Sequence, residues 1–240
     1  MTIIAMWAHP RSVSTAFTRM MMQRGDLTVV HEPLVTLTDF GEVTLPAPAP
    51  AEKTVARRPA EVFAALRAAA AERPVFVKDT LEYRYDHLFE HPDDLRDLTH
   101  TFIVREPERT INSHRALKPD VSLGNIGYEH QWELFKHAWR VTGARPVVVT
   151  AERLLADPAG TVSAYCARVG LSYLPGALSW QPEDRPEFAK TRRWHLDAIA
   201  STGFVPAQKR FEVTVANDPL LRSYYEHHLP FYERLVEHAL

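Results

Sequence analysis

Short apolar runs alternate along the chain with longer segments whose apolar residues recur at helical spacing. The runs predict strands at residues 3–8, 27–30, 74–78, 101–104 and 146–149. The segments between them predict helices over 12–23, 60–73, 128–141 and 158–170, with two more opening at Pro107 and Pro219. Strands that alternate with helices are typical of βαβ units. We therefore expect one α/β domain over residues 1–240, with a central, mostly parallel sheet flanked by helices.

Prolines mark the parts of the chain where this alternation weakens. In residues 44–59, prolines at 46, 48 and 50 alternate with alanine. Proline sustains neither a helix nor a central strand, so we expect a Pro/Ala-rich surface loop there. Pro230 is expected to interrupt the last helix for the same reason. Residues 171–216 show no regular period, and we expect loops with short helices.

Composition narrows the class of protein. Of 240 residues, 45% are apolar and 24% charged, and the formal net charge is -2. A dedicated nucleic-acid-binding protein usually has a strong basic excess, so we expect no nucleic-acid partner. The single cysteine allows no internal disulfide, and no run approaches the roughly 18 apolar residues of a membrane span. We expect a cytoplasmic location and no membrane partner; the sequence leaves the oligomeric state unknown.

Polar clusters follow three of the predicted strands, at residues 9–15, 78–80 and 105–107. Ligands of open α/β sheets bind beyond the carboxyl ends of the strands, so the three clusters predict one shared site. The first cluster places Arg11 and three hydroxyl residues where a helix begins. Unpaired N–H groups and a partial positive charge at such a position suit a phosphate-like anion. No glycine-rich nucleotide-binding loop of the usual form is present.

The third cluster offers a second cation. Arg105 is followed by Pro107, which suits the first turn of a helix, and by Ser113 eight residues after the arginine. Arg105 and Ser113 converge on one anion only if it lies along the flank of that helix. An ion pair between Arg105 and a neighbouring glutamate is the alternative at this stage.

Two of these segments resemble the nucleotide-binding motifs of sulfotransferases that use 3′-phosphoadenosine 5′-phosphosulfate (PAPS). Residues 3–17, IIAMWAHPRSVSTAF, resemble the strand and 5′-phosphosulfate loop, and residues 104–113, VREPERTINS, resemble the 3′-phosphate motif. Residues 229–235, LPFYERL, also resemble bacterial members. The resemblance implies a P-loop-like sulfotransferase fold. It implies transfer of a sulfuryl group from PAPS to a hydroxyl, or an amine, of a small-molecule acceptor, leaving PAP and requiring no metal.

The resemblance also implies roles for individual residues. Arg11 stands where many members have a lysine, and is expected to contact the 5′-phosphosulfate and stabilise charge on its bridging oxygen. Arg105 and Ser113 are expected to hold the 3′-phosphate. The residues expected to line the loop are Ser12, Val13, Ser14 and Thr15, where Val13 replaces a frequent glycine.

A basic segment late in the chain adds two further candidates. In the family such a segment helps to hold the 3′-phosphate, which makes Arg192 and Arg193 candidate ligands. Runs of charge are, however, more often solvated surface.

The sequence leaves the general base open. Many family members carry a histidine shortly after the lysine of the central strand, but Lys78 is followed by Asp-Thr-Leu. Lys78 is the expected second cation on the sulfuryl oxygens. Glu32 is the first candidate for the base, ahead of Asp79 and His31. An equally supported interpretation is that Glu32 pairs with Arg11 or caps a turn before Pro33.

Two other functions stay open. One is an ATP-dependent small-molecule kinase, which would need a carboxylate for Mg²⁺ and usually a lysine in its phosphate loop, where this chain has Arg11. The other is a sulfotransferase fold repurposed to bind a phosphate or pyrophosphate ligand, with different chemistry or none. His87 and His91 are spaced like metal ligands, but no third ligand is evident and we expect no metal site.

An aromatic stripe has two interpretations. Trp132, Phe135 and Trp139 recur at helical spacing. Such a stripe is usually core, and it would also suit the wall of an apolar acceptor pocket.

Overall fold

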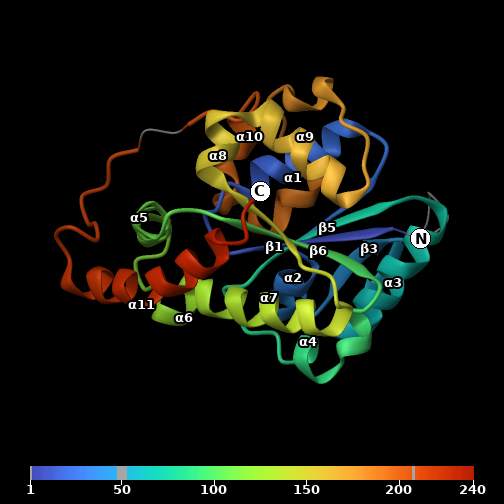
Figure 1. Ribbon diagram of the computed structural model, residues 1–240, viewed down its shortest axis with the longest axis horizontal. Helices are drawn as coiled ribbons and strands as arrows, with labels where there is room; N and C mark the ends of the chain where they lie inside the picture. The colour runs from blue at the N-terminus through green and yellow to red at the C-terminus, as the bar shows by residue number, and fades with distance from the viewer. Residues whose placement is uncertain (1, 48–52, 207–208) are drawn as a thin grey trace.

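A five-stranded parallel sheet forms the centre of the protein (Figure 1). The computed structural model describes residues 2–47, 53–206 and 209–240. The strand order is β2-β5-β1-β6-β7, with every neighbouring pair parallel. The strands are β1 (Ile3–Ala8), β2 (Thr28–His31), β5 (Val75–Thr80), β6 (Leu98–Val104) and β7 (Val147–Thr150). The expected α/β fold with a central parallel sheet is confirmed.

Helices cover both faces of this sheet (Figure 1). One side carries α1 (Ser14–Arg24), α8 (Ala151–Ala156), α9 (Pro158–Val169) and α10 (Leu196–Ala200). The other carries α2 (Pro33–Phe40), α3 (Pro59–Glu72), α4 (His87–Glu90) and α7 (Tyr128–Thr142). The remaining helical segments are α5 (Pro107–Leu117), α6 (Leu123–Ile126), α11 (Pro219–Val236) and the 3-10 turns η1 (Pro92–Asp94), η2 (Pro175–Leu178) and η3 (Pro186–Trp194).

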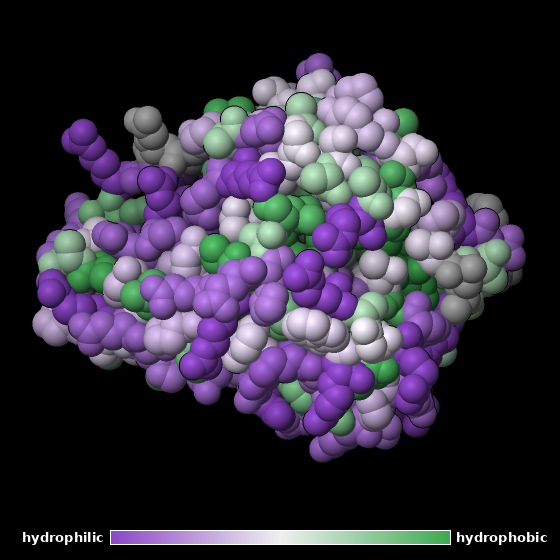
Figure 2. Space-filling model, in the orientation of Figure 1, coloured by the Kyte–Doolittle hydropathy of each residue, from purple (hydrophilic) through white to green (hydrophobic). Residues whose placement is uncertain are grey.

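The central strand shows why the apolar runs were continuous rather than alternating. Successive side chains of β1 point to opposite faces, and both faces are covered. Met6 belongs to the core cluster that contains Phe17 of α1, whereas Trp7 belongs to the cluster that contains Phe63 of α3. The helices turn polar sides outward, and hydrophilic residues cover most of the face in Figure 2, with apolar residues in small groups.

The expectation of a Pro/Ala-rich loop over residues 44–59 needs correction. The structure forms an antiparallel hairpin there from β3 (Val43–Pro46) and β4 (Lys53–Ala56). Val43 and Leu45 are buried while the residue between them is exposed, a period-2 pattern too short to stand out beside the prolines. Pro46 lies at the end of its strand, where a missing N–H is tolerated. Residues 48–52, with two of the prolines, lie outside the described residues.

The expected interruption at Pro230 is also wrong, because α11 runs through this residue. A proline inside a helix removes one backbone hydrogen bond and costs about 3 kcal/mol. Helix α11 packs against α5 and α7 and buries Leu221, His228 and Leu235. This burial offsets the local cost, an effect of tertiary packing that the sequence pattern does not contain.

Replacing Gly127 with alanine is expected to lower the free energy of unfolding by about 2 kcal/mol. Gly127 joins α6 to α7 with φ +90°, and an added Cβ would lie 2.7 Å from the carbonyl oxygen of Leu81. Urea unfolding measures the change. Gly124→Ala is the matched control, since its Cβ would meet nothing nearer than 3.9 Å. A similar loss in both variants would contradict this explanation.

Candidate active site

The connection between β1 and α1 forms a strained loop. Arg11 and Val13 adopt positive φ angles of 64° and 71°, a conformation that favours glycine and is costly for a β-branched residue. Helix α1 therefore begins at Ser14, two residues later than expected, and Val13 offers no side-chain cap. The chain thus adopts the turn that a glycine would favour, and leaves the first N–H groups of α1 without a side-chain acceptor.

Hydroxyl groups line this turn. The Ser12 Oγ is buried and has no hydrogen-bond partner among the described residues. The Thr15 Oγ1 lies 3.1 Å from Nδ1 of His195. Buried polar atoms in native proteins are almost always paired, so a buried, unpartnered hydroxyl beside a helix start is a feature that a bound anion would explain.

The structure brings the two arginine motifs together. Arg11 donates from Nε to Ser113 Oγ (3.0 Å), and Arg105 donates from Nη1 to the Arg11 carbonyl oxygen (3.1 Å). Burial lowers the pKa of both arginines, and they also repel each other. Two partly buried guanidinium groups on either side of one turn create a positive region at the carboxyl ends of β1 and β6.

Arg11 is also held by a segment that the sequence analysis did not place. Its Nη1 donates to the carbonyl oxygen of Trp194 (2.7 Å), and its Nη2 donates to Asp197 (3.0 Å). The expected pairing of Arg11 with Glu32 is therefore replaced by an ion pair with Asp197, whose side chain is half exposed.

Two pockets meet at these residues. The loop pocket is lined by residues 10–16 together with Glu32, Lys78, Thr80, Glu82 and His195, among others. The arginine pocket is lined by Arg109, Asn112, Ser113, Lys209 and Phe211, and also by the acidic residues Glu106 and Glu108. Arg11, Arg105 and Asp197 line both. The two pockets therefore adjoin along these three side chains.

Lys78 and Glu32 form a buried ion pair at the floor of the loop pocket. The Nζ of Lys78 contacts Glu32 Oε1, and the lysine side chain is 1% exposed. Burial alone would raise the pKa of Glu32, but the charge of Lys78 and the neighbouring histidines hold it well below its ordinary value. Glu32 is thus a fixed carboxylate and a weak proton acceptor.

Asp79, the second candidate base, caps a helix instead of facing either pocket. Its oxygens accept from the N–H groups of Leu34 (2.6 Å) and Val35 (3.2 Å) in the first turn of α2, and from that of Thr80 (3.1 Å). Burial raises the pKa of Asp79 to about 7. Its oxygens are committed to backbone donors, as expected of a residue that positions α2.

His31, the third candidate, lies beside Glu32 and faces a histidine that the sequence analysis missed. Its Nε2 is 3.3 Å from Nε2 of His195. Burial lowers the pKa of His31 to about 3, so its imidazole is neutral near neutral pH. No spacing in the sequence connects His195 with residue 31, because the contact spans the chain from the end of β2 to the start of α10.

Glu82 is another residue that the sequence analysis did not single out. It lines the loop pocket near Lys78 and Thr80, and it makes no hydrogen bond or ion pair with the described residues. Burial, together with the charges of Glu32 and Asp39, raises its pKa to about 7. The available signal was its position, four residues after Lys78 in the segment where the family carries its histidine.

Two of the expected nucleotide ligands, Arg192 and Arg193, line neither pocket. Arg192 pairs with Asp184 (2.6 Å) on the surface, and the Arg193 guanidinium lies 4.9 Å from the ring of Trp194. Both residues are exposed, and their role as 3′-phosphate ligands stays a prediction. Arg109 and Lys209 line the arginine pocket instead.

Two further side-chain groups have structural explanations. The stripe Trp132, Phe135 and Trp139 lines neither pocket, and Phe135 packs edge-on against Phe102 of the sheet. His87 pairs with Asp94 (2.8 Å).

Among the helices that the structure describes, none is both long enough and apolar enough to cross a bilayer.

Comparison with known proteins gives distant relatives. The chain is 24% identical over 223 residues to branched-chain-amino-acid aminotransferase-like protein 2 of Arabidopsis thaliana, covering 87% of this chain and 37% of that protein. It is 26% identical over 257 residues to branched-chain-amino-acid aminotransferase-like protein 1 of the same plant, covering 99% of this chain and 42% of that protein. The chain therefore spans less than half the length of the curated relatives it matches.

Among solved structures, the chain is similar to the sulfotransferase domain of the Synechococcus PCC 7002 olefin synthase. The identity is 17%, the match covers 95% of this chain and 94% of that chain, and the TM-score is 0.49. Mouse sulfotransferase SULT7A1 complexed with PAP matches at 12% identity over 98% of this chain and 85% of that chain, with a TM-score of 0.48. The family model described as a sulfotransferase domain matches residues 1–239. The chain belongs to this sulfotransferase domain family.

Proposed function

We propose that the protein transfers a sulfuryl group from PAPS to a hydroxyl, or an amine, of a small molecule and releases PAP. The observation that supports this most directly is the pair of adjoining pockets joined by Arg11 and Arg105. A nucleotide with phosphate groups at both its 3′ and 5′ positions matches two anion sites at a fixed separation. A nucleotide with a single phosphate chain would use only one of them.

In this proposal the 5′-phosphosulfate lies on the loop of residues 11–15 at the start of α1. The backbone N–H groups of that turn and the Ser12 hydroxyl hold its oxygens. The 3′-phosphate lies in the arginine pocket, against Arg105 and Ser113. Arg11 stands between the two ends and contributes its positive charge to both.

The reaction then needs a cation for the leaving group and an acceptor for one proton. The acceptor oxygen attacks sulfur, the bond from sulfur to the bridging oxygen breaks, and PAP leaves with the negative charge on its 5′-phosphate. Lys78 and Arg11 stabilise that charge. Glu32 holds Lys78 in place, and we assign the proton to Glu82, whose pKa of about 7 suits a general base.

Replacing Arg105 with alanine is expected to weaken PAP binding about 10- to 100-fold, because a hydrogen bond to a charged group contributes about 1.5–3 kcal/mol. AMP, which lacks only the 3′-phosphate, is expected to bind the variant and the parent alike. Calorimetric titration of both proteins with PAP, AMP and ADP measures the difference.

Each outcome of that titration separates the functions left open by the sequence. Preference of the parent for PAP over AMP supports a site for the 3′-phosphate. Equal loss of PAP and AMP in the variant would remove Arg105 from this role. Binding of ADP with no preference for PAP would favour the kinase, and no nucleotide binding would favour a repurposed fold.

A further inference from the structure

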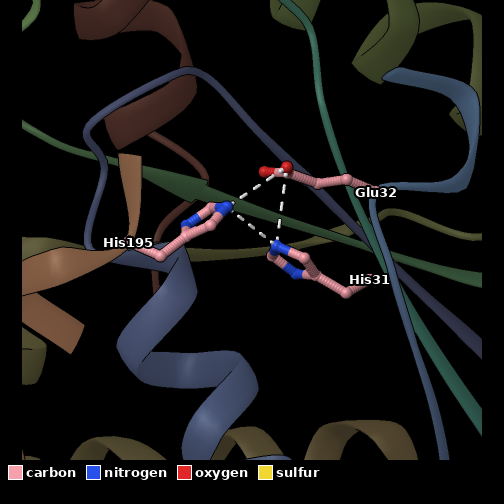
Figure 3. A group of neighbouring side chains, drawn as sticks. All are labelled: His31, Glu32 and His195. Atoms are coloured by element: carbon pink, nitrogen blue, oxygen red, sulfur yellow. Dashed lines mark hydrogen bonds and ion pairs between the residues drawn. The ribbon is translucent and has the colours of Figure 1, made fainter. Parts of the chain in front are cut away.

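Three side chains of the metal-ligating kind converge beside the loop pocket. His31 and Glu32 come from the end of β2, and His195 comes from the start of α10 (Figure 3). The three facing atoms are Nε2 of His31, Oε2 of Glu32 and Nε2 of His195. The two histidine nitrogens are 3.3 Å apart, and they lie 3.5 and 3.7 Å from the carboxylate oxygen.

These three separations are longer than good hydrogen bonds. Hydrogen bonds of N–H to N or O in proteins are about 2.7–3.2 Å long. Ligands of a tetrahedral zinc ion, with bonds of about 2.0–2.2 Å, lie about 3.3–3.5 Å from one another. An octahedral ion with bonds of about 2.1 Å would need about 3.0 Å. The separations of 3.3 and 3.5 Å fall in the tetrahedral range and that of 3.7 Å lies just above it, so the three atoms are closer to one face of a tetrahedron than to one face of an octahedron.

The backbone is bent in the way that brings two consecutive side chains to one point. Neighbouring residues of a strand normally point to opposite faces. Glu32 adopts a φ of 48°, a left-handed conformation that is uncommon for a residue other than glycine. This bend turns its carboxylate toward the imidazole of His31, and all three side chains are buried.

Two of the three side chains also have outer partners of the kind found around metal ligands. Glu32 uses its other oxygen, Oε1, to contact Lys78. His195 has its Nδ1 3.1 Å from the Thr15 hydroxyl. His31 Nδ1 is buried and has no partner among the described residues. The Thr191 hydroxyl, which also lines the loop pocket, hydrogen-bonds to His195 Nε2 (2.9 Å), and a cation on this nitrogen would replace that bond.

We propose that His31, Glu32 and His195 bind one divalent transition-metal cation, and the spacing points to zinc. The fourth ligand position lies on the loop-pocket side, next to Thr191. The cation ties the segment of η3 and α10 to the end of β2. Because Trp194 and Asp197 in that segment bond to Arg11, the cation also fixes the wall between the two pockets. The metal site goes beyond the proposed sulfuryl transfer, and either can fail without the other.

Metal analysis of the full chain tests this directly. The protein is stripped with a chelator, and then titrated with Zn²⁺ and, separately, with Co²⁺. The expected result is one zinc ion per chain and, with cobalt, the strong visible absorption of a four-coordinate site. Stripped protein that takes up no zinc, or weak absorption typical of six-coordinate cobalt, would overturn the proposal.

Variants locate the ion within the chain. His31→Gln and His195→Gln are each expected to weaken zinc binding more than about 100-fold, above the 10- to 100-fold typical of an outer partner. His227→Gln is the matched control, since His227 pairs with Glu129 far along the chain from these residues and is partly exposed. Equal zinc binding by all four proteins would place the ion elsewhere and contradict the assignment. The parent's cobalt spectrum decides the case if a variant fails to fold.

Nucleotide binding distinguishes this failure from failure of the proposed function. PAP is titrated into the stripped and the zinc-loaded protein. PAP binding without zinc uptake would retain the sulfotransferase proposal and reject the metal site. Zinc uptake by a protein that binds no PAP, with or without zinc, would retain the metal site and reject the sulfotransferase proposal.

Discussion

Replacing Lys78 with methionine is expected to lower the free energy of unfolding by about 3–5 kcal/mol at about pH 8. The substitution leaves Glu32 as a buried carboxylate without its main partner, and an unpaired buried charge is far more costly than the loss of one contact. Urea unfolding with a chelator present measures the change, because a cation on the other oxygen of Glu32 would take over part of the compensation.

The double variant Lys78→Met with Glu32→Gln separates the charge from the packing of the side chain. It is expected to recover most of the lost stability, because it removes the uncompensated carboxylate. If Lys78 has the role proposed above, sulfuryl transfer is expected to be lost in both variants, because both lack the cation for the leaving group. A double variant as unstable as the single one would show that the methylene packing of Lys78 dominates.

The ion pair of Lys78 and Glu32 also predicts how the stability of the fold changes with pH. The pKa of Glu32 in the folded protein lies below its ordinary value of 4.5. The folded state therefore binds this proton less tightly than the unfolded state does, and the pair stabilises the fold fully above about pH 4.5. In Lys78→Met the main cause that lowers this pKa is gone, and burial raises it instead, so Glu32 of the variant takes up a proton at a higher pH than in the parent. The difference in stability between the parent and Lys78→Met is therefore expected to narrow as the pH falls from about 8, and to narrow further below about pH 4.5, where the parent loses the contribution of the pair.

The sheet was predictable because its strands are buried on both faces. Runs such as residues 3–8 and 146–149 are apolar at nearly every position, which few other local structures require. The hairpin β3–β4 was not predictable, because each strand has four residues and Pro46 ends the first. The prediction at Pro230 failed for a related reason. The proline does cost the helix stability locally, but the packing of α11 keeps the helix continuous.

The candidate site was predictable to the extent that the chain order places it. The carboxyl ends of β1, β5 and β6 lie side by side, and this brought Arg11 and Arg105, which follow their strands, and Lys78, near the end of β5, into the prediction. Glu82 and His195 could not be predicted from the sequence, for physical reasons. Glu82 differs from a surface glutamate only in its burial, and His195 reaches the site through a contact between distant parts of the chain.

Replacing Glu82 with glutamine is expected to lower kcat about 10²- to 10⁴-fold, the usual contribution of a positioned general base. The rate of the parent should rise with pH through about 7, where Glu82 loses its proton, and level off above it. In the variant this rise is expected to disappear. Initial rates of PAP formation across the pH range measure both effects, once an acceptor is identified by screening.

Stability and nucleotide binding serve as controls for this variant. The pKa of Glu82 is raised above its ordinary 4.5 in the folded protein, so the folded state holds that proton more tightly and loses stability as the pH rises through about 7. Glutamine carries no charge, and the variant should be at least as stable as the parent at about pH 8. Its affinity for PAP should match the parent's, since the nucleotide ligands are intact.

The pH profile also decides between two carboxyl groups with similar pKa values. Burial raises the pKa of Asp79 to about 7 as well, so a pKa alone does not identify the base. Asp79 directs its oxygens to three backbone N–H groups, two of them at the start of α2, whereas Glu82 is free of such bonds among the described residues and lines the loop pocket. A rise near pH 7 that persists in Glu82→Gln would assign the proton to Asp79 and overturn our choice. Its disappearance would show that access to the acceptor, rather than the pKa, selects the general base.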